Sequence, residues 1–357
     1  MKILRTAIVI AYIFLVAGIR VNAQEAASSK AAKWDLSGRI QFQHSYDADK
    51  NADASSTKDG FRIRRARLQT KVKLNSWVRA KIQVEVRDNK PRLKDAEGTL
   101  ILNENVAFRF GQFKVPVWRE ELRSSGKLLL VERSAAAEFL VDELLSARHI
   151  GVELNGKLVK GLSYALNYSN GAGEGGREDA GRSKTMSVNN GKMVSGRLNA
   201  SLGKHVQIGV SGVSNSLGVN IDSLDSRGTI STLAADFGVY LPLGLDVEGG
   251  LALGTKSAEL TGDADQSFVL ADITGRWRHR LKKENTGLVD MVELAAGVSY
   301  VEPNSDIAND ESIHLRFGPA VYFGKHARFQ VNGELALPTA EGASSTFLVR
   351  SQFTLNI

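Results

Sequence analysis

FRIRRARLQTKVKLNSWVRAKIQVEVR, residues 61–87, is the stretch on which the fold assignment depends. From residue 65 to residue 74, Arg, Lys or Gln alternates with an apolar residue or Thr. A short polar turn, Asn75-Ser76, leads into residues 77–87, where the alternation continues. A period of two residues is typical of a β-strand with two different faces. The stretch therefore predicts a β-hairpin with one apolar face and one strongly basic face.

Two classes of protein accommodate such a hairpin. In a soluble sandwich the apolar face packs on a second sheet, whereas in a transmembrane barrel it faces lipid and the charged face lines a channel. A single soluble core rarely reaches 357 residues, so the soluble alternative requires two β-sandwich domains. A closed barrel avoids this limit because it encloses a lumen.

The N-terminus predicts export. Lys2 and Arg5 precede the apolar run 7–19, and Val21-Asn22-Ala23 suits cleavage after Ala23. A retained anchor is the alternative, but the apolar run is short for a membrane span. We therefore expect a signal peptide at residues 1–23, a flexible leader at 24–33 and a transmembrane β-barrel porin domain at 34–357, in the bacterial outer membrane. With no Cys, a disulfide framework is excluded.

Strand-like segments of about 9–11 residues, the length that a tilted strand needs to cross a bilayer, recur along the chain. Five come before residue 115 and eleven after residue 147; the later eleven are near 148–156, 162–170, 193–202, 205–214, 230–241, 244–254, 267–278, 288–301, 311–323, 327–337 and 346–357. Short turns alternate with longer polar loops, such as 171–192, 215–229 and 302–310. The pattern predicts an all-β fold, a 16-stranded antiparallel transmembrane β-barrel wide enough for an aqueous channel.

Residues 115–147 interrupt the strand pattern. They carry an apolar stripe at helical spacing, preceded by Ser134 as a candidate N-cap: Ala136, Phe139, Leu140, Leu144 and Ala147. We expect this third loop to fold inward and to narrow the pore.

Motifs for catalysis are missing from the sequence. Residues 171–176 (GAGEGG) match GxGxxG, but no apolar helix follows, so we expect a loop. The six His residues are scattered, and there is no P-loop, nucleophile elbow or zinc pattern. We predict no enzymatic activity, no cofactor, no metal and no nucleic-acid partner.

The polar phase of the first five strands is strongly basic. It contains Arg39, Arg65, Arg67, Lys71, Lys73, Arg79, Lys81, Arg87 and Arg109, whereas the later strands mix both signs of charge. A basic wall in a narrow pore with low-dielectric walls concentrates anions. The alternative is a wall that balances acidic loops or binds lipopolysaccharide phosphates at the rim.

Six short motifs resemble, in the same order, the phosphate-selective porins of the O and P type. They are residues 60–67 (GFRIRRAR), 94–96 (KDA), 110–116 (FGQFKVP), 124–125 (SS), 131–134 (VERS) and 148–152 (RHIGV). The resemblance covers residues 34–170, and beyond residue 170 only the strand rhythm supports it.

The resemblance implies a 16-stranded outer-membrane porin, usually trimeric, which takes up phosphate, pyrophosphate or polyphosphate past a constriction formed by the third loop. It places Lys81 and Asp95 at the pore lining, and Ser124, Ser125 and Arg133 on the third-loop segment that meets the anion. Together with Arg65 and Arg67, which can donate charge-assisted hydrogen bonds to phosphate oxygens, these residues form the predicted substrate site.

The leading hypothesis is a passive porin for small anions of the phosphate class, embedded among outer-membrane lipid and lipopolysaccharide as a homotrimer. A general diffusion porin of low selectivity is the first alternative. A structural or adhesive barrel, whose loops bind an external partner, is the second.

Overall fold

The computed structural model describes residues 32–47, 59–176, 191–221, 224–281 and 287–357. The predicted signal peptide lies outside these residues, and so do all but the last two residues of the predicted leader. The chain divides into two units, residues 1–33 and 34–357.

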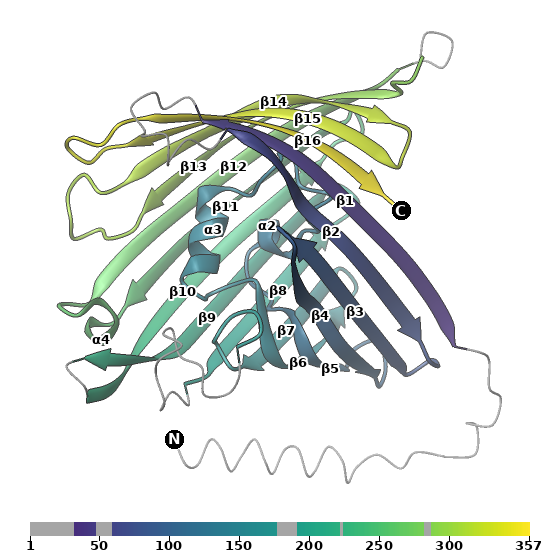
Figure 1. Ribbon diagram of the computed structural model, residues 1–357. Helices are drawn as coiled ribbons and strands as arrows, with labels where there is room; N and C mark the ends of the chain where they lie inside the picture. Colours follow the sequence, from purple (N-terminus) through teal and green to yellow (C-terminus); the bar gives the residue numbers. More distant parts are fainter. Residues whose placement is uncertain (1–31, 48–58, 177–190, 222–223, 282–286) are drawn as a thin grey trace, which may run out of the picture. The chain divides into compact units, whose positions relative to one another are not determined.

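Sixteen strands are found among the described residues, and they form one closed antiparallel barrel (Figure 1). Each strand pairs with its neighbours in the sequence, and β1 closes the barrel on β16, with Phe42 opposite Phe353. The strands are β1 (Lys33–Asp47), β2 (Gly60–Lys73), β3 (Val78–Arg87), β4 (Lys90–Ile101), β5 (Ala107–Lys114), β6 (Arg148–Val159), β7 (Leu162–Ser169), β8 (Met193–Leu202), β9 (Val206–Ile221), β10 (Leu224–Tyr240), β11 (Leu245–Lys256), β12 (Gln266–Arg280), β13 (Met291–Glu302), β14 (Ser312–Phe323), β15 (Ala327–Pro338) and β16 (Thr346–Asn356). The predicted number and direction of strands are confirmed.

Strand β13 shows how the sequence sets the two faces of the barrel. Leu294 and Val298 are 58% and 41% exposed on its outer side, whereas Glu293 and Ser299 are 3% and 0% exposed on its inner side. Apolar side chains face lipid and polar side chains face the lumen, because successive residues of a strand point to opposite faces. Among the described residues, no helix is both long and apolar enough to cross a membrane.

The prediction of a long loop at residues 215–229 is wrong. Strand β9 continues to Ile221 and β10 begins at Leu224, and the two pair over this region, for example Ser216 with Thr229. The polar composition of 215–229 suggested a loop. The inner side of this extension packs on the third loop, where Leu217 is 1% exposed, and its outer side carries polar residues such as Ser216 and Thr229.

The third loop contains two helices, α2 (Arg119–Leu122) and α3 (Ala135–Asp142), which lie within the ring of strands (Figure 1). Ser134 caps α3 as predicted, because its Oγ accepts a hydrogen bond from the backbone N–H of Ala137 at 3.1 Å. The helix is shorter than the apolar stripe. Leu144 has a positive φ of 58° and lies beyond the helix.

An apolar core joins the third loop to the inner wall of strands β8–β13. Trp118, Leu140 and Leu145 of the loop are almost fully buried. They belong to one cluster with side chains of the wall: Met193, Val213, Leu217, Ile230, Ala234, Ala252, Phe268, Leu270 and Val301. The ring centroids of Phe139 and Phe268 are 5.1 Å apart. The loop therefore packs on one side of the barrel, opposite the basic strands.

We expect Leu140→Ala to weaken this packing without preventing barrel assembly. Truncation of a fully buried Leu costs about 2–5 kcal/mol. This loss destabilises the packing of the third loop on the inner wall, so single-channel conductance should rise and become noisier. Leu294→Ala, on the lipid-facing side, is the matched control and should leave conductance unchanged. Equal conductance of Leu140→Ala and wild type in planar bilayers would contradict the proposed docking.

Candidate functional site

Two cavities lie along the basic strands. The outer cavity, about 810 Å³, is lined by residues of β2–β6, α3 and residues 173–175, and lies toward the long loops. The inner cavity, about 360 Å³, is lined by residues of β2–β6 and the third loop, with Ala165 and Arg197, and lies toward the short turns. Arg67, Lys114 and Arg148 line both cavities. The passage from one cavity to the other is therefore bordered by three cations.

Both cavities have an excess of positive charge. Among the described residues, the outer cavity is lined by nine Arg or Lys side chains and four carboxylates, and the inner cavity by six and two. In a narrow space bounded by protein and lipid, such an excess raises the local concentration of anions.

Arg65 and Arg67, two predicted site residues, face the lumen with acidic partners. Arg65 is 4% exposed; it donates a hydrogen bond to Gln41 Oε1 at 2.9 Å, and its Nη2 lies 3.5 Å from Glu132 Oε2. Arg67 forms an ion pair with Glu85 and donates to Ser125 Oγ at 2.8 Å. The two arginines are therefore partly neutralised by the protein itself.

Lys81 and Asp95, also predicted, contact each other. Lys81 Nζ lies 3.1 Å from Asp95 Oδ2 and 3.1 Å from Glu97 Oε1. Asp95 in turn accepts hydrogen bonds from Arg148 Nε at 2.7 Å and from Arg148 Nη2 at 3.3 Å. Asp95 thus holds two cations of the inner cavity, Lys81 and Arg148, in place.

Ser124, Ser125 and Arg39 form a group next to this pair. Arg39 Nη1 donates to Ser124 Oγ at 3.2 Å and to Ser125 Oγ at 3.3 Å, and Arg39 Nε donates to Asn356 Oδ1 at 2.9 Å. No ion pair joins Arg39 to a carboxylate of the described residues. Ser125 Oγ also accepts from Arg67, so this hydroxyl is free to point its hydrogen toward a bound anion.

Arg133, the last of the predicted site residues, contacts other residues of the third loop to which it belongs. Its Nε lies 2.6 Å from Glu121 Oε2, and its Nη2 donates to the backbone carbonyl of Arg123 at 3.1 Å. Lys114 Nζ lies 3.1 Å from the other oxygen of Glu121. Arg133 and Lys114 both line the outer cavity, so this buried carboxylate moderates two of its cations.

The remaining residues of the predicted basic wall fall into two groups. Arg109 is paired with Glu153 at 2.7 Å and lies over the ring of Phe113. Lys71, Lys73 and Arg79 are exposed near the short turn after β2, and no ion pair with another described residue is found for them. Among the described residues of this wall, the charges of Lys71, Lys73 and Arg79, like that of Arg39, are therefore not balanced by an ion pair.

Several residues of the site were missed by the sequence analysis. Glu132 is the main one, since it pairs with Arg64 Nε at 2.5 Å as well as with Arg65. Arg64 and Arg148 lie inside quoted motifs, but a strict alternation places Arg64 on the face opposite to Arg65. Acidic residues on the inward-facing side of the strands, such as Glu85, could have indicated that the lumen arginines have carboxylate partners.

A β-bulge determines where Lys94 and Asp95 point. The register between β3 and β4 shifts after Gln83, so that Asp95 pairs with Gln83, Leu93 pairs with Val84, and Lys94 has no partner strand residue. A bulge redirects side chains at the position of the extra residue. Consequently Lys94 lines the outer cavity, while the adjacent Asp95 lines the inner one.

The ionisation of two third-loop carboxylates follows from their surroundings. Burial by itself raises the pKa of Glu132, but hydrogen bonds and charge from Arg64 and charge from Arg65 outweigh it and hold this pKa well below its ordinary value. Burial likewise opposes ionisation of Glu121, and the charges of Arg133 and Lys114 lower its pKa overall. Both groups remain ionised over the physiological range.

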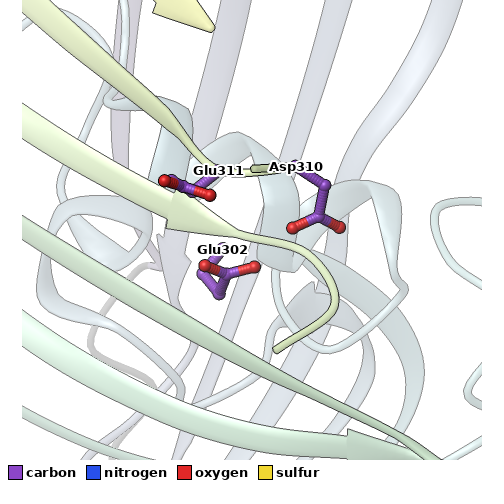
Figure 2. Close-up of side chains that lie close together, drawn as sticks. All are labelled: Glu302, Asp310 and Glu311. Atoms are coloured by element: carbon purple, nitrogen blue, oxygen red, sulfur yellow. The ribbon is translucent and has the colours of Figure 1, made fainter. Parts of the chain in front are cut away.

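A separate acidic cluster lies at the end of β13 and in the segment that leads to β14 (Figure 2). One oxygen from each of Glu302, Asp310 and Glu311 lies within 4.8 Å of the others. Carboxylate oxygens of this kind suit a hard cation, yet partly exposed acidic groups are common without one. The cluster lines neither cavity, and we assign it no part in the channel.

Comparison with known proteins gives a family match and a fold match. The family model described as phosphate-selective porin O and P matches residues 36–245. No curated protein sequence matches the chain.

Solved structures support the fold. An anion-selective porin from Comamonas acidovorans has a TM-score of 0.66 at 10% identity, covering 92% of this chain and 100% of that chain. The trimer form of OmpT from Vibrio cholerae has a TM-score of 0.61 at 12% identity, covering 92% and 100%. The channel DcaP of Acinetobacter baumannii has a TM-score of 0.61 at 14% identity, covering 92% and 99%.

The pH dependence of Glu132→Gln tests this electrostatic account. A lowered carboxyl pKa means that the ion pairs of Glu132 contribute fully above the ordinary carboxyl range and are lost only as pH falls through the lowered value. The variant frees Arg64 and Arg65, so its reversal potential in a KCl gradient should shift toward anion selectivity. This difference from wild type should stay constant between about pH 7 and pH 4, below which an ordinary Glu is mostly protonated.

A difference that shrinks by more than half between pH 7 and pH 4 would show that Glu132 titrates as an ordinary Glu. Glu104→Gln is the control, because Glu104 lies on a short turn outside both cavities and should change selectivity little at pH 7.

Proposed function

The chain belongs to the phosphate-selective porin O and P family, and from this membership and its lumen we propose that it is an outer-membrane porin for passive diffusion of small anions, with phosphate, pyrophosphate or polyphosphate as the substrate class. The fold is that of a channel rather than an enzyme.

The observation that carries the proposal is the position of Arg67, Lys114 and Arg148. These cations line both cavities, so any solute that passes between them along the basic strands meets all three. Charge-assisted hydrogen bonds from such groups to phosphate oxygens are shorter and stronger than neutral ones. An anion can exchange part of its hydration shell for these donors.

The Arg39, Ser124 and Ser125 group supplies donors of a second kind. Ser124 lines the inner cavity, and Ser125 accepts hydrogen bonds from both Arg39 and Arg67. Arg39 does not line the inner cavity itself, but it has no carboxylate partner among the described residues and donates to both serines, so its charge supports an anion that they hold there. Each group binds moderately, which suits transport, since a permeant ion must also leave.

A general porin of low selectivity is the second candidate, and the ion pairs favour it. Arg64, Arg67 and Arg148 each contact a carboxylate, namely Glu132, Glu85 and Asp95. Such pairs cancel much of the charge that a solute experiences beyond a few ångströms. Selectivity therefore depends on the cations whose charge is not cancelled by a neighbouring carboxylate.

The proposal extends to assembly and location. We propose a homotrimer, supported by the OmpT structure described as a trimer form. Cleavage after Ala23 and contact with lipopolysaccharide remain predictions. The anion-selective Comamonas porin supports anion transport only as a protein of similar fold.

Arg67→Gln should lower anion selectivity and weaken block of chloride current by phosphate. The variant removes a cation from both cavities, and lumen residues influence selectivity more than barrel stability. Arg350→Gln is the matched control. Arg350 is paired with Glu334 on the inner side of β15 and β16 and lines neither cavity.

Reversal potentials in a planar bilayer under a KCl gradient, followed by a phosphate titration, measure both effects. An anion-selective wild type with chloride current blocked by phosphate supports the proposal. A potential near zero without block supports the low-selectivity porin. A complete lack of conductance would favour a structural or adhesive barrel.

A further inference from the structure

The glycine-rich segment 171–176, which the channel function does not explain, lies at the outer cavity. Gly173, Glu174 and Gly175 line this cavity. Gly171, Gly173 and Gly175 have φ values of 72°, 79° and 74°, a region that favours glycine. Gly176 N–H donates to the carbonyl of Gly173 at 3.1 Å and closes a tight turn around Glu174. The glycines allow the chain to present Glu174 at the tip of this turn.

Three side chains of the barrel fix the turn. Gly173 N–H donates to His149 Nδ1 at 3.2 Å, and Gly175 N–H donates to Gln112 Oε1 at 2.8 Å. Asn215 Nδ2 donates to the carbonyl of Gly171 at 2.9 Å. His149 and Asn215 are both 0% exposed, so these tethers belong to the rigid wall. Glu174 is therefore held at a defined position.

The side chain of Glu174 reaches Lys94. Glu174 Oε2 lies 2.5 Å from Lys94 Nζ, and the two side chains are 26% and 13% exposed. Lys94 is the extra residue of the β4 bulge, and Gln112 Nε2 holds this bulge by donating to the carbonyls of Leu93 and Lys94 at 2.6 and 2.9 Å. Gln112 thus binds both the turn and the bulge and aligns the two charged groups.

We propose that Glu174 is a specificity-determining residue of the outer cavity, which occupies Lys94 with a carboxylate of the protein so that an incoming anion must displace it. This inference rests on the proposed anion-selective function. A phosphate group carries the same kind of acceptor oxygens as a carboxylate. Glu174 therefore competes with the substrate for the same donor.

The competition affects weak and strong anions differently. Chloride carries a single charge, so its contact with Lys94 gives little net binding free energy once the Glu174 carboxylate, which the turn holds in place, has been displaced. A multiply charged phosphate can contact Lys94 together with other cations of the same cavity, so it regains more than it displaces. Glu174 consequently weakens the binding of both kinds of anion at the mouth, and it disfavours chloride more than phosphate.

The test uses single variants and a double-mutant cycle. Glu174→Gln should lower the concentration of inorganic phosphate that half-blocks the chloride current from the long-loop side by about two- to fivefold, the size expected for a partly exposed ion pair. Glu138→Gln is the matched control. Glu138 lines the same cavity and is not in an ion pair with any described residue, so its removal changes only the general field.

In a Lys94→Gln background, the effect of Glu174→Gln should fall to that of Glu138→Gln, because the pair no longer exists. The proposal is overturned if Glu174→Gln and Glu138→Gln have equal effects in the wild-type background, or if the Glu174→Gln effect persists fully without Lys94.

This outcome is separable from the proposed function. The coupling between Glu174→Gln and Lys94→Gln can also be measured from reversal potentials in a KCl gradient, which do not require phosphate to block the channel. A wild type without anion selectivity would contradict the proposed function. The coupling between Glu174 and Lys94 would still confirm or exclude the ion pair as a determinant of selectivity.

Discussion

The docking of the third loop on the apolar inner wall of β8–β13 is the interaction on which the rest of the lumen depends. A barrel in lipid must close to satisfy its backbone, but closure alone leaves an open lumen. Here Trp118, Leu140 and Leu145 bury themselves against the wall and fill one side of it. Polar contacts fix the orientation of the loop, because Arg328 donates to the carbonyls of Leu128 and Leu129 at 3.0 and 3.2 Å. The outer and inner cavities along the basic strands remain open beside the docked loop.

Confinement makes charge balance a structural requirement. Unpaired charges in a narrow, poorly hydrated space are costly, so most cations of the wall have an acidic partner. Glu132 of the third loop pairs with Arg64, and Glu121 of the same loop lies 3.1 Å from Lys114. Asp95 of β4 pairs with Arg148 within the wall. The two loop carboxylates anchor the loop, and all three reduce the positive charge that remains. Loop docking and the net charge of the lumen are therefore two consequences of the same contacts.

Sequence reasoning recovered the barrel, its strand number and the inward third loop, because alternation and helical spacing are local signals. It placed Arg65 and Lys81 in the lumen for the same reason, whereas Asp95 was placed there by the family resemblance. It missed the pairing of Arg64 with Glu132, since their contact joins residues 68 positions apart and Arg64 departs from strict alternation. It also took 215–229 for a loop, because polar composition by itself does not distinguish a loop from an extended strand. Contacts between side chains on opposite sides of the lumen can be identified only once the closed barrel is known.

The bulge at Lys94 illustrates how a small departure from regularity acquires a role. In a regular strand Lys94 and Asp95 would point to opposite faces, and one charge would face lipid at a high cost. The extra residue turns both toward the lumen, on either side of the passage bordered by Arg67, Lys114 and Arg148. Asp95 then orients Arg148 from the inner cavity, while Lys94 is available to a carboxylate or an anion in the outer one. One backbone irregularity thus places a positive charge in the outer cavity and a negative charge in the inner one. The net charge of each cavity then depends on which carboxylates the loops place beside its cations.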